Sequence, residues 1–335
     1  MHATSNRQAT FNYTIDIVTE SDLPALVAFF NECDRLEHLE EGMTLVELTE
    51  WFHNPVNKSK YLMARLANEG SAELPAGDNQ GTGSEGGVIG CVEFELKPLH
   101  DSAEGWLQVH PHYRNAGVGR ALYAEFERRA TEAGVAYMRI GANSNAHLAI
   151  EFLERRGFAL ERYFWSMRLP TETPVGPPDL PPGITARTFV PGQDEELWTH
   201  VRNATFAEHY GSVPRTVEEM SHFSRQEHFR PEGLFFAFDG DRIAGFCSTR
   251  IDPHEQERLG ISIGHINTLG VMPAYRGRGI GRGLLLIGVD YLRRFVSVVG
   301  LGVEGKNERA LALYEGVGFR RHKGWAIMEK KLSGL

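Results

Sequence analysis

The sequence lacks the features of a membrane, secreted or disulfide-stabilised protein. It contains only three cysteines, Cys33, Cys91 and Cys247, which lie far apart. An odd number of widely spaced cysteines predicts buried free thiols in a reducing compartment. No apolar run reaches the roughly 18 residues of a membrane-spanning helix, and the polar N-terminal stretch has no apolar core of a secretory signal. We therefore expect a cytoplasmic protein that is not attached to a membrane.

The charge balance and the histidine spacing narrow the function classes further. The net charge of −9 argues weakly against a nucleic-acid partner and weakly for a cationic one, although solubility alone explains it as well. His200, His209, His222 and His228 share one segment but do not have the spacing of metal ligands. We expect neither nucleic-acid binding nor a bound metal.

The main positive signal is an internal repeat. LQVHPHYRNAGVGRALY at 107–123 aligns with LGVMPAYRGRGIGRGLL at 269–285, and FLERRGF at 152–158 aligns with LYEGVGF at 313–319. A repeat of this length is typical of a duplicated domain rather than of a solenoid, whose units span roughly 20–50 residues. The chain is therefore expected to contain the same domain twice.

A proline-rich stretch separates the two copies. Residues 169–183 contain six prolines and two glycines, and proline fixes φ and removes a backbone donor. We expect an N-terminal domain at 11–170 and a C-terminal domain at 183–335, joined by a semi-rigid linker at 171–182. The small polar residues of 68–87 predict a long hairpin tip without function.

The order of strand-like and helix-like segments is the same in both copies. A strand and a helical segment come first, followed by further strands, of which one ends at Val109 or Val271. A glycine-rich loop, a helix, another strand, a short helix and final strands complete each copy. This order predicts the α/β class with an α+β mixed sheet: two tandem domains, each a central, mostly antiparallel sheet flanked by helices.

In both copies a Tyr-Arg-x-x-Gly-x-Gly loop follows a strand and precedes a helix. Glycines let backbone N–H groups turn toward one point, and the helix start adds unpaired donors and a positive dipole end. Such a loop is suited to a diphosphate. Neither copy ends in the Gly-Lys-Ser/Thr of a Walker loop, and the position inside the domain does not fit a Rossmann fingerprint. Cationic charge is expected from Arg276, Arg278 and Arg282 in the second copy, and from Arg114 and Arg120 in the first.

Together these motifs resemble the GNAT superfamily of acyl-CoA-dependent N-acetyltransferases, over both halves of the chain. The family's downstream Asn-x-x-Ala-x-x-x-Tyr-x-x-x-Gly-Phe is complete as Asn307, Ala310, Tyr314, Gly318 and Phe319. The resemblance implies acetyl-CoA as the cofactor, with its pyrophosphate on the loop amides and its pantetheine along the preceding strand. The implied cofactor-binding residues are Leu269, Gly270, Val271, Arg276, Gly277, Arg278, Gly279, Ile280, Gly281, Arg282 and Asn307, and in the first copy Arg114, Ala116, Gly117, Val118 and Gly119.

The resemblance also implies catalytic roles. Tyr314 would protonate the departing CoA thiolate, because a tyrosine with a pKa of about 10 keeps its proton at neutral pH. GNAT enzymes often carry a Glu base six residues before the strand-ending aliphatic residue, where this chain has His265. His265 is a candidate base or, alternatively, a sheet histidine that only hydrogen-bonds. Asn267, Glu208 and His209 are expected near the acceptor substrate.

The first copy lacks the predicted acid. Alignment from the Gly-Phe pair puts Leu153 at the position of Tyr314, and leucine cannot donate a proton. Ala103 occupies the base position, next to Glu104. We expect the N-terminal domain to be non-catalytic, as a weak CoA binder or a structural partner.

The two-domain layout is similar to that of the mycothiol synthase group of this superfamily, which acetylates the cysteinyl amine of a pseudo-disaccharide thiol precursor. His265 and Asn267 stand where that group has an acidic and an aromatic residue facing the acceptor. We therefore predict an acetyl-CoA-dependent N-acetyltransferase, a monomer or homodimer, that acetylates a primary amine of a small molecule. The amine would attack directly in a ternary complex, in the C-terminal domain. Two alternatives stay open: mycothiol synthase proper, and a CoA-binding tandem module without turnover.

Overall fold

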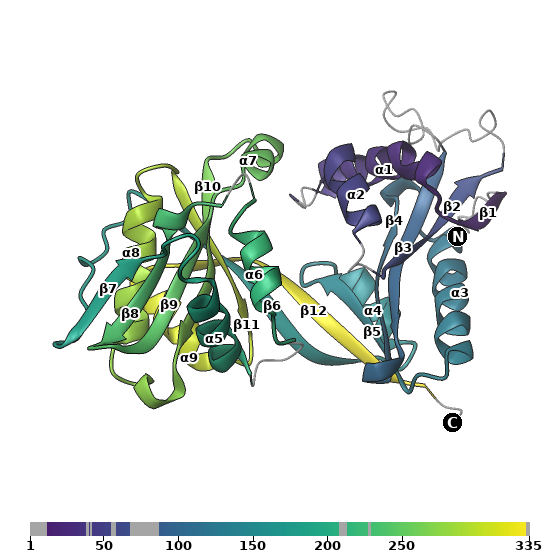
Figure 1. Cartoon of the computed structure of the whole chain (residues 1–335). Helices are drawn as coiled ribbons and strands as arrows, with labels where there is room; N and C mark the ends of the chain where they lie inside the picture. Colours follow the sequence, from purple (N-terminus) through teal and green to yellow (C-terminus); the bar gives the residue numbers. More distant parts are fainter. Residues whose placement is uncertain are drawn as a thin grey trace, which may run out of the picture. The chain divides into compact units, whose positions relative to one another are not determined.

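The computed structural model contains two compact units (Figure 1). One comprises the chain up to Tyr163 together with the segment from Trp325 onward, and the other runs from Phe164 to Gly324. Each unit is a mixed α/β domain with helices against a central sheet, which confirms the predicted fold class. The structure describes residues 12–37, 40, 42–54, 58–67, 87–207, 213–226 and 229–332.

The first unit contains a mixed sheet in which β4 and β5 are parallel and the other neighbours are antiparallel. In order across the sheet its strands are β1 (Tyr13–Ile17), β2 (Lys60–Leu66), β3 (Val88–Lys97), β4 (Ser102–Val109), β5 (Tyr137–Asn143) and the part of β12 (Arg320–Lys331) from Trp325 onward. Its helices are α1 (Leu23–Glu37), α2 (Leu45–His53), α3 (Val118–Glu132) and α4 (His147–Glu154), with short 3-10 turns at Glu20–Asp22, Pro98–His100 and Pro111–Tyr113.

The second unit repeats this arrangement, with β10 and β11 as the parallel pair. In order across the sheet its strands are the part of β6 (Ala159–Pro170) from Phe164 onward, β11 (Val298–Glu304), β10 (Ile263–Val271), β9 (Arg242–Arg250), β8 (Leu234–Asp239) and β7 (Ile184–Thr188). Its helices are α5 (Glu195–Phe206), α6 (Val217–Phe223), α7 (Pro253–Leu259), α8 (Ile280–Leu292) and α9 (Glu308–Val317), with 3-10 turns at Pro231–Gly233 and Pro273–Tyr275.

In each unit, one of the two parallel strands also pairs with a strand that is distant from it in sequence. Residues 164–170 of β6 pair with β11 in the second unit, and residues 325–331 of β12 pair with β5 in the first. The expected limits at 170 and 183 follow the linear order of the chain, whereas the contacts group 164–170 with the second unit. The alternating pattern of a terminal strand shows which of its faces is buried, but it does not show which sheet edge the strand joins.

The second unit buries apolar side chains on both faces of its sheet. Val299, Leu301 and Val303 alternate along β11 and pack in one core with residues of α8 and α9. On the other face, Phe246 of β9 packs in a separate core with Trp198 of α5. The sheet therefore lies between two helical layers, and strand residues of opposite parity face different surroundings.

Residues 171–183 are packed against the second unit. A Cβ added at Gly283 of α8 would lie 2.6 Å from Leu180 Cδ2, and one added at Gly279 would lie 3.7 Å from Pro181. The guanidinium of Arg293 donates a hydrogen bond to the carbonyl of Thr173. The segment predicted as a linker thus lies along α8, and its contacts include the glycine that precedes this helix.

Two kinds of helix start occur in the chain. The hydroxyl of Thr44 accepts from the backbone N–H of Glu47 at 3.1 Å, and that glutamate accepts from the N–H of Thr44 at 2.6 Å, which caps α2. In contrast, α8 begins after Gly279, and no described side chain caps it. An uncapped helix start leaves backbone donors available to a ligand.

Candidate active site

The glycine loop of the second unit forms an open turn before α8. Gly277 and Gly279 have φ values of +83° and +87°, which residues with a Cβ adopt at a steric cost. These two positions turn the chain sharply from the 3-10 turn at Pro273–Tyr275 into the first helical residue, Ile280. Without a side-chain cap, the first N–H groups of α8 provide the positive end of a helix dipole.

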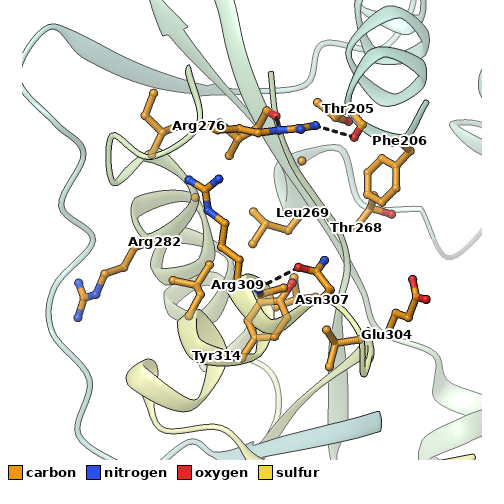
Figure 2. A pocket seen from close by; sticks show the side chains of 18 of the residues that line it. Thr205, Phe206, Thr268, Leu269, Arg276, Arg282, Glu304, Asn307, Arg309 and Tyr314 are labelled. Atoms are coloured by element: carbon orange, nitrogen blue, oxygen red, sulfur yellow. Dashed lines mark hydrogen bonds between the residues drawn. The ribbon is translucent and has the colours of Figure 1, made fainter. Parts of the chain in front are cut away.

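A cavity of about 830 Å³ begins at this loop and extends along β10 (Figure 2). Its size is within the roughly 300–1,000 Å³ of small-molecule and cofactor sites. Of the residues predicted from the sequence for the second copy, those that line it are Asn267, Leu269, Gly270, Val271, Arg276, Gly277, Gly279, Ile280, Gly281, Arg282, Asn307 and Tyr314. Arg278 and His265 do not line it in the described part of the chain.

Beyond Ile266, β10 and β11 separate. Their parallel pairing covers Ile263–Ile266 and Val298–Leu301, and the register of β10 with β9 shifts at Asn267. Thr268 of β10 and Gly302 of β11 both line the cavity between the two strands. The separated strand edges leave backbone groups available to an extended, amide-containing ligand.

Tyr314 lines the cavity from α9 and is 8% exposed. Burial raises the pKa of Tyr314 to about 12, and the nearby thiol of Cys247 adds to the effect. Within the described residues its hydroxyl has no hydrogen-bond partner. The side chain therefore presents a protonated, unengaged hydroxyl at physiological pH.

Asn307 begins α9 as its N-cap. Its side-chain oxygen accepts from the backbone N–H of Ala310 at 3.1 Å, as Figure 2 shows. The side-chain oxygen is therefore engaged in the helix, and the amide NH₂ is the donor that Asn307 offers to the cavity.

Arg276 lines the cavity and also makes hydrogen bonds within the protein. Its Nε donates to the carbonyl of Val271 at 3.2 Å, and its Nη2 donates to the carbonyl of Thr205 at 3.4 Å (Figure 2). These bonds join the end of β10 to α5. Arg114 of the first unit repeats the first bond, to Val109 at 3.3 Å, so the guanidinium is held to the end of the preceding strand in both copies.

Arg309 is a cavity-lining cation that the sequence reasoning missed. It lies in the first turn of α9, and a Cβ added at Gly277 would be 3.5 Å from its Nη2. Its guanidinium thus lies beside the glycine loop, where an anion would bind. The available signal was its position inside the Asn-x-x-Ala motif, next to Ala310.

His265 forms an ion-pair cluster with a residue that the sequence reasoning also missed. Its Nε2 lies 3.0 Å from the carboxylate of Glu255 on α7, which also accepts from Arg250 at 3.3 Å. Burial alone would raise the pKa of Glu255, but the contact with His265 and the charges of Arg250 and Arg258 together lower it. The His265 ring lies over Gly300, where an added Cβ would be 2.6 Å from Nδ1.

The first unit repeats the loop but not the cavity lining. Gly117 has a φ of +89° before α3, like its counterpart Gly279. The ring of Trp106 covers Gly141, where an added Cβ would be 2.6 Å from Cε3. At the matching Gly302 an added Cβ would meet no atom within 4 Å. In the first unit an aromatic ring therefore occupies the space that is open in the second.

The register also changes which residue matches His265. The sequence count gave Ala103, but His265 pairs with Arg250 and Gly300 as Glu104 pairs with Glu95 and Arg139. The irregularity at Asn267 adds one residue to β10 and explains the difference. Glu104 is bound by Lys97 at 2.7 Å and by Arg139 at 3.3 Å, which together lower its pKa against the opposing effect of burial.

Several expectations fall outside these observations. Glu208 and His209 lie outside the described residues. No group of three or more His, Cys, Asp or Glu side chains in the described ranges is arranged to hold a metal ion. Among the helices that the structure describes, none is long and apolar enough to cross a membrane.

The chain contains two similar α/β units, and each has a glycine turn before an uncapped helix. One of them also has an open cleft beside a buried tyrosine. These features define a tandem acyltransferase. The Acetyltransferase (GNAT) family model matches residues 27–158 and again 198–319, and the chain belongs to that family. The duplication predicted from the sequence is thereby confirmed.

Named relatives and solved structures agree with this assignment. The chain is 35% identical to "Mycothiol acetyltransferase" of Thermobispora bispora over 68% of this chain and 75% of the relative. It is 30% identical to "Mycothiol acetyltransferase" of Frankia alni over 93% and 92%. In fold it is similar to a GCN5-related N-acetyltransferase from Sphaerobacter thermophilus, with a TM-score of 0.72 at 22% identity over 95% of both chains. A tandem GNAT protein from the clavulanic acid biosynthesis pathway gives a TM-score of 0.70 at 14% identity, over 97% of this chain and all of the other.

Proposed function

We propose that this acyltransferase moves an acetyl group from acetyl-CoA to the primary amine of a small molecule, and that the chemistry takes place in the second unit. The observation that carries the proposal is the cleft of about 830 Å³, which joins the uncapped start of α8 to the unengaged hydroxyl of Tyr314. The first unit has the glycine turn, but it has Leu153 and the Trp106 ring in place of the acid and the open space.

The residues of the cleft fit the parts of acetyl-CoA. The first N–H groups of α8, with Arg309 beside Gly277 and Arg282 on the cavity wall, would hold the diphosphate. The separated edges of β10 and β11 would hold the amide-containing arm, with the side-chain NH₂ of Asn307 as a further donor. Acetyl-CoA supplies the thioester acyl group, and the remaining chemistry belongs to side chains of the chain.

Tyr314 is suited to give a proton to the leaving sulfur. Its raised pKa of about 12 keeps it protonated, and the burial that causes this also raises the proton affinity of a thiolate in the same cleft. The acid and the leaving group therefore stay closer in pKa than they would be if only the tyrosine were buried. A general acid in such a position typically contributes a factor of about 10²–10⁴ in rate.

His265 is the candidate for removing the proton of the attacking amine. It precedes the cavity-lining Ile266 by one residue, and its contact with Glu255 at 3.0 Å orients the imidazole ring. Because His265 does not line the cavity among the described residues, we assign the transfer to a bridging water. One proton then leaves the amine through His265 while another passes from Tyr314 to the sulfur.

The test is thiol release from acetyl-CoA with a panel of small primary amines, together with detection of the N-acetyl product. Tyr314→Phe is expected to lower kcat by about 10²-fold or more while the protein stays folded. The matched control is Tyr291→Phe, which removes a hydroxyl in the same unit that contacts Glu232 at 3.3 Å and does not line the cleft. A loss of less than about threefold in Tyr314→Phe would remove the proposed acid.

Mycothiol synthesis is a second candidate, favoured by the relatives named "Mycothiol acetyltransferase" at 30% to 36% identity. The cysteinyl amine implied by that resemblance belongs in the same panel of acceptors. If it is acetylated far faster than the other amines, the specific function is supported. The third reading, a CoA-binding module without turnover, requires that no amine in the panel be acetylated.

A further inference from the structure

A second, smaller cavity of about 150 Å³ lies within the first unit. Its lining comes from α1, β2, β3 and β4 and includes three aromatic rings, those of Phe30, Tyr61 and Trp106. Two carboxylates, Asp34 and Glu93, also line it, and among the described residues no Lys, Arg or His does. An aromatic and acidic lining of this kind favours a cationic ligand over an anionic or neutral one.

Glu93 is a partly buried carboxylate on the wall of this cavity. It is half-buried, and its contacts are the ring N–H of Trp51 at 3.4 Å and the hydroxyl of Tyr61, both neutral donors. No ion pair to Glu93 occurs in the described part of the chain. Two residues further along β3, Glu95 instead lies 3.4 Å from Lys97. A partly buried carboxylate without a counter-charge is unfavourable, and a bound cation would remove that penalty.

The aromatic walls are held by the fold. Tyr61 is 3% exposed and donates its hydroxyl proton to Glu93. Trp106 is opposite Glu93 in the register of β3 and β4, and its ring is pressed against Gly141 of β5. Side chains fixed in this way lose little conformational freedom when a ligand binds, so the pocket is preformed.

The same features argue against acyl transfer in this cavity. The Trp106 ring occupies the space that is open beside Gly302 in the second unit. Cys91, whose thiol is on the cavity wall, is buried, and burial raises its pKa. The reactive thiolate form of Cys91 is therefore disfavoured. The first unit therefore has a pocket that is suited to binding rather than to chemistry.

We propose that this pocket binds a compact organic ammonium ion, with Glu93 as the counter-charge and the rings of Tyr61 and Trp106 as walls. Its volume of about 150 Å³ is well below that of a nucleotide or disaccharide site. The aromatic walls disfavour a hydrated metal ion, which needs several oxygen ligands. The proposal concerns the first unit and does not depend on acetyl transfer in the second.

The test is isothermal titration calorimetry on the full chain with choline chloride and 2-aminoethanol hydrochloride as probes. The neutral control is 3,3-dimethylbutan-1-ol, which has the shape of choline without its charge. We expect saturable binding of both cations and an affinity for the neutral compound that is lower by about tenfold or more. Absence of saturable binding of the cations, or equal binding of the neutral compound, would overturn the proposal.

Variants locate the site. Glu93→Gln keeps the hydrogen-bond acceptor for Tyr61 and Trp51 but removes the charge, so the affinity for both cations should fall by about tenfold or more. Glu95→Gln changes a carboxylate on the same strand that Lys97 already neutralises, and it should leave the affinity unchanged. Tyr314→Phe should also leave it unchanged, which separates this proposal from the fate of the proposed function. Binding that survives Glu93→Gln, or that is lost in Tyr314→Phe, would assign the cation to a different place.

Discussion

Replacing Gly302 by valine tests whether the gap between β10 and β11 holds the acyl carrier. Gly302 lines the cleft, and an added Cβ would meet no atom within 4 Å, so the fold itself accommodates a side chain there. Glycine inside a strand is destabilising by about 0.5–1 kcal/mol relative to alanine, so the free energy of unfolding should stay equal or rise slightly. The valine would instead intrude on the space assigned to the pantetheine arm.

Gly141→Ala is the matched control in the first unit. Its Cβ would lie 2.6 Å from the ring of Trp106, and overpacking of this kind destabilises by about 1–3 kcal/mol. At about 2–4 °C per kcal/mol, the melting temperature should fall measurably. The two glycines occupy equivalent places in the two copies, but the expected effects differ. Gly302→Val should lose activity, whereas Gly141→Ala should lose stability.

The assay combines thermal unfolding with the acetyl-CoA dependence of thiol release. A misplacement of about 1 Å in an active site can lower the rate about 10²-fold, and we expect a loss in kcat/KM of that order for Gly302→Val. Gly141→Ala should keep kcat/KM near the wild-type value at temperatures where it is folded. The reasoning is refuted if Gly302→Val keeps kcat/KM within about twofold of wild type while acetyl-CoA remains the donor.

Two further predictions concern charged groups. Glu255→Gln removes the carboxylate that contacts His265 at 3.0 Å, and kcat should fall about tenfold with little change in KM for acetyl-CoA. The control, Glu257→Gln on the same helix, should have no effect. An unchanged kcat in Glu255→Gln would exclude a catalytic role for the contact between His265 and Glu255. Glu125 has its pKa lowered from 4.5 to about 2, by Arg128 first and then by Arg129 against the opposing effect of burial. Because the folded-state pKa is depressed, this carboxylate stabilises the fold above pH 4.5, and the contribution is lost as the pH falls toward 2. Glu125→Gln should therefore lower the free energy of unfolding by about 0.5–1 kcal/mol at neutral pH and by less at acidic pH. Urea denaturation measures this difference. A difference that does not vary with pH would contradict the stabilising role of the Glu125 carboxylate.

Local motifs made much of the fold and cleft predictable. The first glycine of the repeated Arg-x-x-Gly-x-Gly loop is required by the backbone, since Gly117 and Gly279 both adopt left-handed φ values. The Asn307-to-Phe319 motif placed Tyr314 on a helix beside the loop, and both line one cleft. These features depend on residues close in sequence, so spacing alone predicts them.

The features that sequence reasoning missed depend on contacts between distant segments. The pairing of residues 164–170 with β11 joins segments more than a hundred residues apart, and no local pattern encodes it. The irregularity at Asn267 shifted the count by one and concealed that Glu104 is the counterpart of His265. Likewise, the bonds of Arg276 to Val271 and Thr205 join the loop to the end of β10 and to α5, and no local pattern predicts them.

The most direct measurement is a crystal structure of the full chain with CoA. The account predicts the diphosphate at Gly277–Gly281 before α8, the pantetheine arm between β10 and β11, and the sulfur near the Tyr314 hydroxyl. A structure in which CoA occupies the loop at Gly117–Gly119 while the cleft of the second unit stays empty would contradict the account.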